Sequence, residues 1–264
     1  MPNLTDIRLF LFDMDGTIYL GDRLFPFTKP LLARIRETGR RYMFLTNNSS
    51  KSVADYVRKL ARLGIEATEE DFLTSGQATA YWLKKNWGSR RIYVGGTKSL
   101  LAEFEAAGLN VTDRYGEDIE AVVCGFDTEL TFAKLDDLSR LLTKGLPYIA
   151  THPDMVCPTE YGFVPDCGAV CEMLYHATGR RPEAVIGKPE PLMPQMAMEI
   201  AGVTPAETAV VGDRLHTDIE SGLRAGALGI LVFSGETTPE ILAASPTVPS
   251  MTLADCGEIL EALL

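Results

Sequence analysis

The segment Leu9-Phe-Leu-Phe-Asp-Met-Asp-Gly-Thr-Ile18 carries more information about the fold than any other part of the chain. Its apolar run is typical of a buried strand, and Asp13 and Asp15 follow at the carboxyl end. Because strand side chains alternate between faces, the two acids point the same way if the strand continues between them. Open α/β sheets place their active sites beyond these strand ends. The segment therefore predicts either a carboxylate site or, since Asp and Gly favour turns, a solvated turn.

The composition is that of an acidic globular protein. The chain has 264 residues, a formal net charge of −11 and 46% hydrophobic residues. The negative charge disfavours nucleic acids and anionic membranes as partners. No stretch approaches the roughly 20 apolar residues of a membrane helix, and the first residues lack a signal-peptide pattern. The 5 cysteines include no Cys-x-x-Cys pair, so we expect reduced thiols and a cytoplasmic location.

Strand and helix patterns alternate along the chain, which predicts an α/β fold with parallel sheets covered by helices on both faces. In the first part and the last third, the expected strands cover residues 9–12, 41–45, 184–186, 208–211 and 228–233. The expected helices there cover residues 28–38, 53–63, 192–201 and 217–225. The middle third has its own cycle, with strands at 91–94, 121–124 and 147–150 and helices at 98–107 and 132–142.

The middle third is too long to be a simple connection, because a crossover between parallel strands needs only about a dozen residues. We therefore expect residues 75–180 to form an inserted α/β cap domain. Residues 1–74 and 181–264 then form one doubly wound parallel-sheet core.

Polar groups follow two further predicted strands. Thr46 and Asn47 come after the second strand, where they either cap the next helix or bind an anion at its N-terminus, and the two roles are compatible. Lys188 follows a short strand and Gly187. It is either an ordinary surface lysine or a fixed positive charge for a phosphate group.

A second pair of acids ends the series. Asp213 follows the apolar strand at 208–211, and Asp218 lies on the helix expected after it. Asp213 could complete the carboxylate set of a divalent cation, while Asp218 either ligates it, supports a ligand, or only matches the helix dipole. Acids, hydroxyl and amide donors, a lysine and further acids, each after a strand, together predict a magnesium-dependent phosphoryl-transfer site.

These motifs resemble those of the haloacid dehalogenase superfamily of phosphatases. The four motifs appear in order: Asp13-x-Asp15-Gly-Thr, Thr46-Asn47, Lys188-Pro189 and Gly212-Asp213-x-x-x-x-Asp218. The whole chain is similar to the NagD-like, or 4-nitrophenylphosphatase-like, branch. The resemblance implies a Rossmann-like core with an α/β cap inserted between the Thr and Lys motifs.

The resemblance also implies a role for each site residue. Asp13 is expected to be the nucleophile that forms an aspartyl-phosphate, and Asp15 the acid and base. Thr46, Asn47 and Lys188 are expected to bind phosphate. Mg²⁺ is expected on Asp13, the backbone carbonyl of Asp15, and Asp213, with Asp218 in support.

The expected activity is hydrolysis of small phosphorylated metabolites, such as nucleoside monophosphates or sugar phosphates, and of 4-nitrophenyl phosphate in vitro. Asp15 favours hydrolysis over dehalogenation, whose enzymes lack the second acid. The alternative is a non-catalytic protein that senses a phosphorylated metabolite. His152 departs from the branch, which more often has Asn or Asp there, and Cys157 lies where relatives carry a selective side chain. The resemblance is also compatible with a homodimer formed through the cap.

Overall fold

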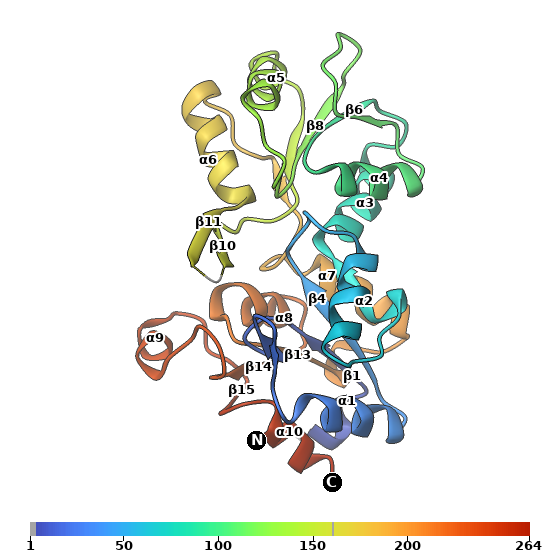
Figure 1. Cartoon of the computed structure of the whole chain (residues 1–264), viewed down its shortest axis with the longest axis vertical. Helices are drawn as coiled ribbons and strands as arrows, with labels where there is room; N and C mark the ends of the chain where they lie inside the picture. Colours follow the sequence, from blue (N-terminus) through green and yellow to red (C-terminus); the bar gives the residue numbers. More distant parts are fainter. Residues whose placement is uncertain (1–3, 160) are drawn as a thin grey trace. The chain divides into compact units, whose positions relative to one another are not determined.

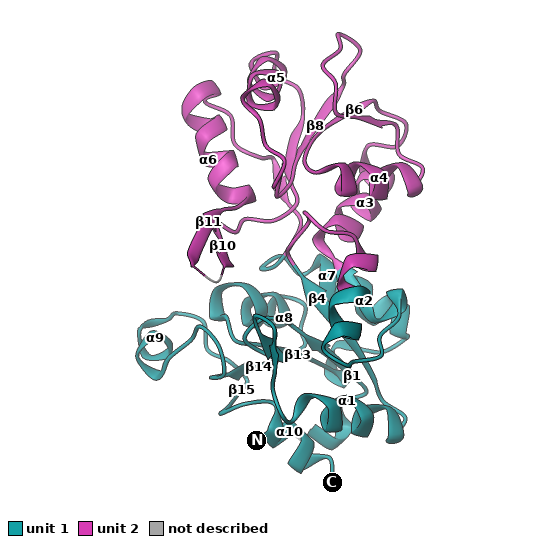
Figure 2. Cartoon of the chain, in the orientation of Figure 1, with its two compact units in different colours: residues 1–46, 57–73, 188–264 teal, residues 47–56, 74–187 magenta. Residues whose placement is uncertain are grey.

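The chain folds into two compact units, each described here by its own contacts (Figures 1 and 2). The computed structural model describes residues 4–159 and 161–264. Unit 1 comprises residues 1–46, 57–73 and 188–264, and unit 2 comprises residues 47–56 and 74–187. The sequence predicted a cap over residues 75–180. Unit 2 has its main boundaries at 74 and 187, and it also includes the separate segment 47–56.

Unit 1 is built on a six-stranded sheet in the order β15-β14-β13-β1-β4-β5. Its strands are β1 (Leu9–Phe12), β4 (Arg41–Thr46), β5 (Phe72–Thr74), β13 (Thr208–Gly212), β14 (Leu228–Val232) and β15 (Met251–Leu253). The central strand β1 pairs in parallel with both β13 and β4, with Leu9 opposite Thr208 and Arg41. All four residues of β1 are buried, as expected for a strand covered on both faces. The predicted α/β parallel-sheet fold is confirmed.

The strand order reverses between β1 and β13. From β1 the chain builds outward through β4 to β5, and from β13 it builds the other way through β14 to β15. Because crossovers between parallel strands are right-handed, the helices that connect successive strands in these two halves lie on opposite faces of the sheet. The C-terminal helix is not a crossover helix, and it packs against the first helix. The helices are α1 (Thr28–Glu37), α2 (Val53–Arg62), α7 (Leu192–Ala201), α8 (Glu220–Arg224), α9 (Pro239–Ala244) and α10 (Gly257–Ala262). The first four residues of α2 belong to the segment 47–56 of unit 2. Ligands of open α/β sheets bind at such a reversal, beyond the carboxyl ends of the strands.

Unit 2 is a second α/β layer structure, with a five-stranded sheet in the order β12-β9-β8-β6-β7. Its strands are β6 (Ile92–Gly95), β7 (Val111–Thr112), β8 (Ala121–Cys124), β9 (Tyr148–Ala150) and β12 (Ala184–Val185). Its helices are α3 (Ser75–Asn86), α4 (Lys98–Ala106), α5 (Phe132–Thr143) and α6 (Cys167–Thr178). A separate hairpin joins β10 (Val156–Thr159) to β11 (Gly162–Pro165).

Several elements differ from the sequence expectations. The helices α3 and α6 and the β10–β11 hairpin were not predicted. The helix expected at 217–225 begins earlier, as a π-helical turn over Leu215–Ile219 that leads into α8. Of the residues described, no helix combines the length and the apolar character that crossing a membrane requires.

A buried ion pair ties two segments of unit 2 together. His152 follows β9, and its Nε2 lies 2.8 Å from Oδ1 of Asp166, the residue that precedes α6. Burial lowers the pKa of His152, but the hydrogen bond with Asp166 and the negative charges of Asp166 and Asp154 oppose that effect, and the pKa is raised to about 9. The histidine is therefore protonated in the folded protein at neutral pH.

This pair makes stability depend on pH. An unfolded histidine titrates near pH 6.5, so the stabilisation is complete below about pH 6.5 and is lost as the pH rises to about 9. We expect unfolding of unit 2 to become easier by up to about 3 kcal/mol across this window. Both tryptophans, Trp82 and Trp87, belong to unit 2, so urea unfolding followed by their fluorescence measures it. The His152→Asn variant lacks the titrating ring, so an equally steep slope in that variant would contradict the assignment.

Candidate active site

One buried ammonium group joins two acids of the predicted site. The Nζ of Lys188 lies 2.7 Å from Oδ1 of Asp13 and 2.6 Å from Oδ1 of Asp218. It also donates to the backbone carbonyl of Leu45 in β4 at 3.2 Å. Lys188 is only 3% exposed, so this charge is held in place by its partners. Asp13 directly follows β1, and the lysine therefore connects the ends of two neighbouring strands to Asp218.

Asp213 follows β13, beside Asp13 across the reversal of the strand order. Its Oδ2 accepts a hydrogen bond from the backbone N–H of Glu236 at 2.7 Å, whereas its buried Oδ1 has no hydrogen-bond partner. Two glycines make room for this carboxylate. A Cβ at Gly16 would lie 2.5 Å from Oδ2 of Asp213, and a Cβ at Gly235 would also collide with it. The backbone thus leaves a narrow space that only the Asp213 carboxylate fills.

The local charges fit a divalent cation. One carboxylate oxygen from each of Asp13, Asp213 and Asp218 lies within 4.8 Å of the others. Burial raises the pKa of Asp13 to about 6, against the lowering effect of Lys188, and burial with neighbouring acids raises the pKa of Asp213 to about 8. Burial is the largest cause of both shifts, and the neighbouring acids add to it. Hard oxygen ligands and the unpartnered Oδ1 of Asp213 are what a cation such as Mg²⁺ requires.

Asp15 occupies a different environment from the other acids. Strand β1 ends at Phe12 and does not continue through Asp15, so strand alternation does not place Asp13 and Asp15 on one face. Asp15 is exposed, and its Oδ1 lies 3.5 Å from the backbone nitrogen of Gly21. Its carboxylate is not part of the group formed by Asp13, Asp213 and Asp218. Partial burial, countered by the charge of Lys59, raises its pKa.

The two residues of the Thr motif lie on either side of the boundary between the units. Thr46 is the buried last residue of β4 in unit 1, and Asn47 is the first residue of the 47–56 segment of unit 2. Within unit 2, Nδ2 of Asn47 donates to both carboxylate oxygens of Asp154 at 3.2 Å. A Cβ at Gly187 would lie 2.5 Å from Oδ1 of Asn47, so only glycine fits there without displacing that side chain.

Comparisons with known proteins identify the family. Residues 10–110 match the model for haloacid dehalogenase-like hydrolases, and residues 185–259 match a HAD-hydrolase-like model. The acid sugar phosphatase of Staphylococcus haemolyticus is 32% identical over 254 residues, which cover 96% of this chain and 95% of the relative. The chain belongs to the haloacid dehalogenase-like hydrolases. The resemblance found in the sequence motifs is confirmed.

Solved structures show the same architecture over nearly the whole chain. The 4-nitrophenylphosphatase of Thermotoga maritima is 42% identical, with a TM-score of 0.94 and 99% of both chains covered. The glycerol phosphate phosphatase of Mycobacterium tuberculosis in complex with magnesium is 30% identical, with a TM-score of 0.89, and the match covers 100% of this chain and 79% of the other. The hydrolase therefore shares its NagD-like fold with proteins named as phosphatases.

The sequence did not assign a role to two charged residues that contact predicted site residues: Arg214, which contacts Asp218, and Asp154, which contacts Asn47. The backbone N–H of Arg214 donates to Oδ2 of Asp218 at 3.1 Å, and the Arg214 side chain pairs with Glu236 at 2.8 Å. The π-helical turn that follows accommodates this contact, and such turns are frequent at functional sites. Arg214 directly follows Asp213 in the Gly212-Asp-Arg motif, and this position was the sequence signal that could have identified it. No local pattern linked Asp154 to Asn47.

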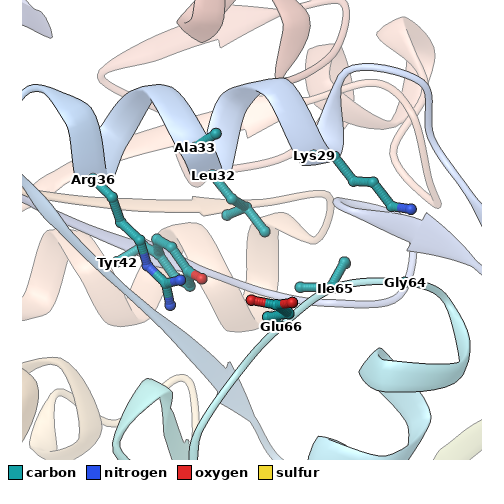
Figure 3. Close-up of a pocket in the computed structure, with 8 residues that line it drawn as sticks. All are labelled: Lys29, Leu32, Ala33, Arg36, Tyr42, Gly64, Ile65 and Glu66. Atoms are coloured by element: carbon teal, nitrogen blue, oxygen red, sulfur yellow. The ribbon is translucent and has the colours of Figure 1, made fainter.

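A surface pocket elsewhere in unit 1 is separate from these groups (Figure 3). It has a volume of about 180 Å³ and lies between α1 and residues 64–66. Arg36 at its edge pairs with Asp71 at 3.2 Å and stacks on Tyr42. No predicted site residue lines it; its lining consists of Lys29, Leu32, Ala33, Arg36, Tyr42, Gly64, Ile65 and Glu66. The pocket is thus not the candidate active site.

The glycine beside Asp213 provides a matched test of this geometry in the hydrolase. Gly16 and Gly21 both have positive φ, +85° and +60°, but nothing lies within 4 Å of a Cβ at Gly21. We expect Gly21→Ala to cost about 1 kcal/mol of unfolding free energy from backbone strain alone. Gly16→Ala should cost a further 1–3 kcal/mol, roughly, because its Cβ displaces the Asp213 carboxylate. Urea unfolding of both variants measures the difference, and equal losses would show that Asp213 moves freely.

Proposed function

We propose that this hydrolase is a Mg²⁺-dependent phosphatase that cleaves phosphomonoesters of small metabolites through an aspartyl-phosphate. The observation that carries the proposal is the carboxylate of Asp13, paired with buried Lys188 at 2.7 Å and grouped with Asp213 and Asp218. A nucleophilic carboxylate, a fixed positive charge and acidic metal ligands are the parts that phosphoryl transfer needs. Relatives named as acid sugar phosphatase and 4-nitrophenylphosphatase support it.

Asp13 is the proposed nucleophile. Its pKa of about 6 keeps the carboxylate mainly ionised at neutral pH, as attack on phosphorus requires. One carboxylate oxygen forms the new bond to phosphorus while the bond from phosphorus to the leaving alcohol oxygen breaks. The product of this step is an acyl phosphate on Asp13 and a free alcohol.

Asp15 is the proposed acid and base. Burial raises its pKa, and in its protonated form it gives its proton to the departing alcohol oxygen. The carboxylate that remains takes a proton from a water molecule as that water attacks phosphorus. This second step releases inorganic phosphate and restores Asp13. Its place outside the carboxylate group leaves the Asp15 side chain available for these proton transfers.

Binding and charge neutralisation fall to the remaining residues. Thr46, Asn47 and Lys188 are proposed to hold the phosphate, with Lys188 supplying positive charge in a buried setting where charges interact strongly. Asp13, the backbone carbonyl of Asp15, and Asp213 are proposed to hold Mg²⁺, supported by Asp218. When bound, the ion neutralises phosphate charge and orients the reacting groups. Local cations therefore offset the repulsion expected from a net charge of −11.

The proposed substrates are small phosphorylated metabolites, with sugar and polyol phosphates favoured. Relatives are named acid sugar phosphatase and glycerol phosphate phosphatase. Unit 2, as the cap, is proposed to select among these substrates.

Phosphate release tests the proposal directly. We expect the wild-type protein to hydrolyse 4-nitrophenyl phosphate and a panel of sugar phosphates with Mg²⁺, and to lose this activity with a chelator. Asp13→Asn should lower kcat by at least about 10⁴-fold, because the amide is not a nucleophile. Asp6→Asn, an exposed acid of the same unit, is the matched control. A folded wild-type protein that binds Mg²⁺ and hydrolyses none of these esters would instead favour the sensor alternative.

Asp15→Asn tests the intermediate. The 4-nitrophenolate group leaves readily without an acid, so the first step should still occur in this variant. The second step lacks its base and should slow by about 10² to 10⁴-fold. We expect a burst of one nitrophenolate per protein molecule followed by slow turnover in rapid-mixing absorbance experiments. Slow turnover without a burst would contradict a base-assisted second step on a phosphorylated Asp13.

A further inference from the structure

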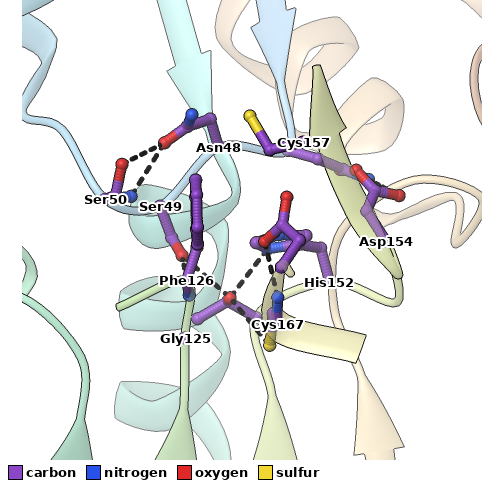
Figure 4. Close-up of polar contacts among 12 residues, drawn as sticks. Asn48, Ser49, Ser50, Gly125, Phe126, His152, Asp154, Cys157 and Cys167 are labelled. Carbon is purple, nitrogen blue, oxygen red and sulfur yellow. Dashed lines mark hydrogen bonds and ion pairs between the residues drawn. The ribbon is translucent and has the colours of Figure 1, made fainter. Parts of the chain in front are cut away.

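The backbone of the Asn47–Ser50 segment is fixed by residues of the cap (Figure 4). The hydroxyl of Ser75, at the start of α3, donates to the carbonyl of Asn47 at 2.5 Å. The hydroxyl of Thr97, which caps α4, donates to the carbonyl of Ser50 at 3.1 Å. Both contacts are buried, so the segment that contains a proposed phosphate ligand takes its position from cap helices.

Ser49 is the buried centre of this attachment. Its Oγ accepts a hydrogen bond from the backbone N–H of Phe126 at 2.9 Å and lies 3.0 Å from Oγ1 of Thr151. Gly125 permits the approach, because a Cβ there would lie 3.2 Å from Oγ of Ser49. Ser49 is 1% exposed and Thr151 is fully buried. Water therefore does not replace these hydrogen bonds when one partner is removed.

The protonated ring of His152 sets the direction of the hydroxyl chain. Nε2 lies 2.8 Å from Oδ1 of Asp166, and Nδ1 lies 2.9 Å from Oγ1 of Thr151. Since the raised pKa of His152 places a proton on both ring nitrogens, each of them is a donor. The Thr151 oxygen is then an acceptor toward His152, so its own proton is available for Ser49 at 3.0 Å rather than for the more distant Cys167 sulfur at 3.8 Å. The ion pair of His152 and Asp166 thereby orients Thr151 toward the segment.

Asp154 acts on the Asn47 side chain itself. Its two carboxylate oxygens both accept from Nδ2 of Asn47, which fixes which end of the amide is nitrogen. The loop that carries Asp154 is held in turn, because the backbone N–H of Gly168 in α6 donates to the Asp154 carbonyl at 2.8 Å. This backbone hydrogen bond therefore fixes the position of the loop that carries the Asp154 carboxylate.

We propose that Thr151 and Asp154 are positioning residues for phosphate recognition. Thr151 fixes the segment through Ser49, and Asp154 fixes the orientation of the Asn47 amide. The inference rests on the proposed function, since it assumes that Asn47 binds phosphate. Neither residue needs to touch phosphate: each acts through a neighbour in the Asn47–Ser50 segment. Their loss therefore weakens phosphate binding while the acids and the lysine of unit 1 remain in place.

Four variants separate this role from a general effect on folding. Thr151→Val removes the hydroxyl at nearly constant shape, and Thr151→Ser restores it. Asp154→Ala removes the acceptor from a partly exposed position. Thr143→Val, an exposed threonine of α5 whose hydroxyl bonds only within its helix in the described contacts, is the matched control. The measurements are KM and kcat for 4-nitrophenyl phosphate, the inhibition constant of inorganic phosphate, and the melting temperature.

We expect Thr151→Val and Asp154→Ala to raise KM and the inhibition constant of phosphate together, by about 5- to 30-fold. The change in kcat should be smaller, and Thr151→Ser and Thr143→Val should stay within about twofold of wild type. Unchanged KM and phosphate inhibition in the folded Asp154→Ala and Thr151→Val variants would overturn the proposal, as would an equal loss in Thr151→Ser. If Thr151→Val does not fold, Asp154→Ala decides alone.

The outcome also distinguishes this inference from the proposed function. A wild-type protein without phosphatase activity refutes the proposed function, yet calorimetric titration with inorganic phosphate and Mg²⁺ still compares the variants. Weaker phosphate binding in Asp154→Ala and Thr151→Val then supports the positioning role. Equal binding in all four variants, or phosphate binding that is absent from the wild type, overturns it.

Discussion

Three clustered carboxylates, two of them paired with one buried lysine, impose the central constraint on this structure. Asp213 and Asp218 are buried and Asp13 is partly buried, and one oxygen of each lies close to the others, while Lys188 pairs with Asp13 and Asp218. Holding like charges together requires a rigid support, because a flexible chain would let them separate. The support is the pair β1 and β13, which run in parallel at the reversal of the strand order and release one acid each at the same edge.

The remainder of the core follows from that requirement. A Cβ at Gly16 or Gly235 would collide with the Asp213 carboxylate, so both positions need glycine. The π-helical turn after β13 allows the Arg214 backbone to hold the second oxygen of Asp218. Burial, together with the neighbouring acids, raises the pKa values of Asp13 and Asp213. A divalent cation is the simplest group that completes this balance.

The parts that the sequence predicted are those encoded by adjacent residues. Three strands end at Thr46 or directly before Asp13 and Asp213, and each is a short, largely apolar run that is fully or almost fully buried. The ends of such runs can be recognised in the sequence. Contacts between residues that are far apart in the chain have no comparable sequence signal. Asn47 and Asp154 are 107 positions apart, and nothing in either stretch points to the other. Helix α3 was missed although Thr74 and Gln77 form a capping box at its start, a local signal that was available. The π-helical turn has no comparable sequence signature.

The division of the chain limits how the protein can be taken apart. The path passes between the units at four peptide bonds, and two of these, Thr46–Asn47 and Gly187–Lys188, adjoin residues assigned to phosphate binding. Cutting the chain at 74 and 187 would remove the main body of the cap but leave residues 47–56 without Ser75, Thr97, Phe126 and Thr151, the groups that hold them. A truncated core would thus still contain Asn47, but the contacts that fix its position would be lost. Exchange of caps between relatives accordingly requires the transfer of a second piece, the ten-residue segment 47–56, together with the inserted domain.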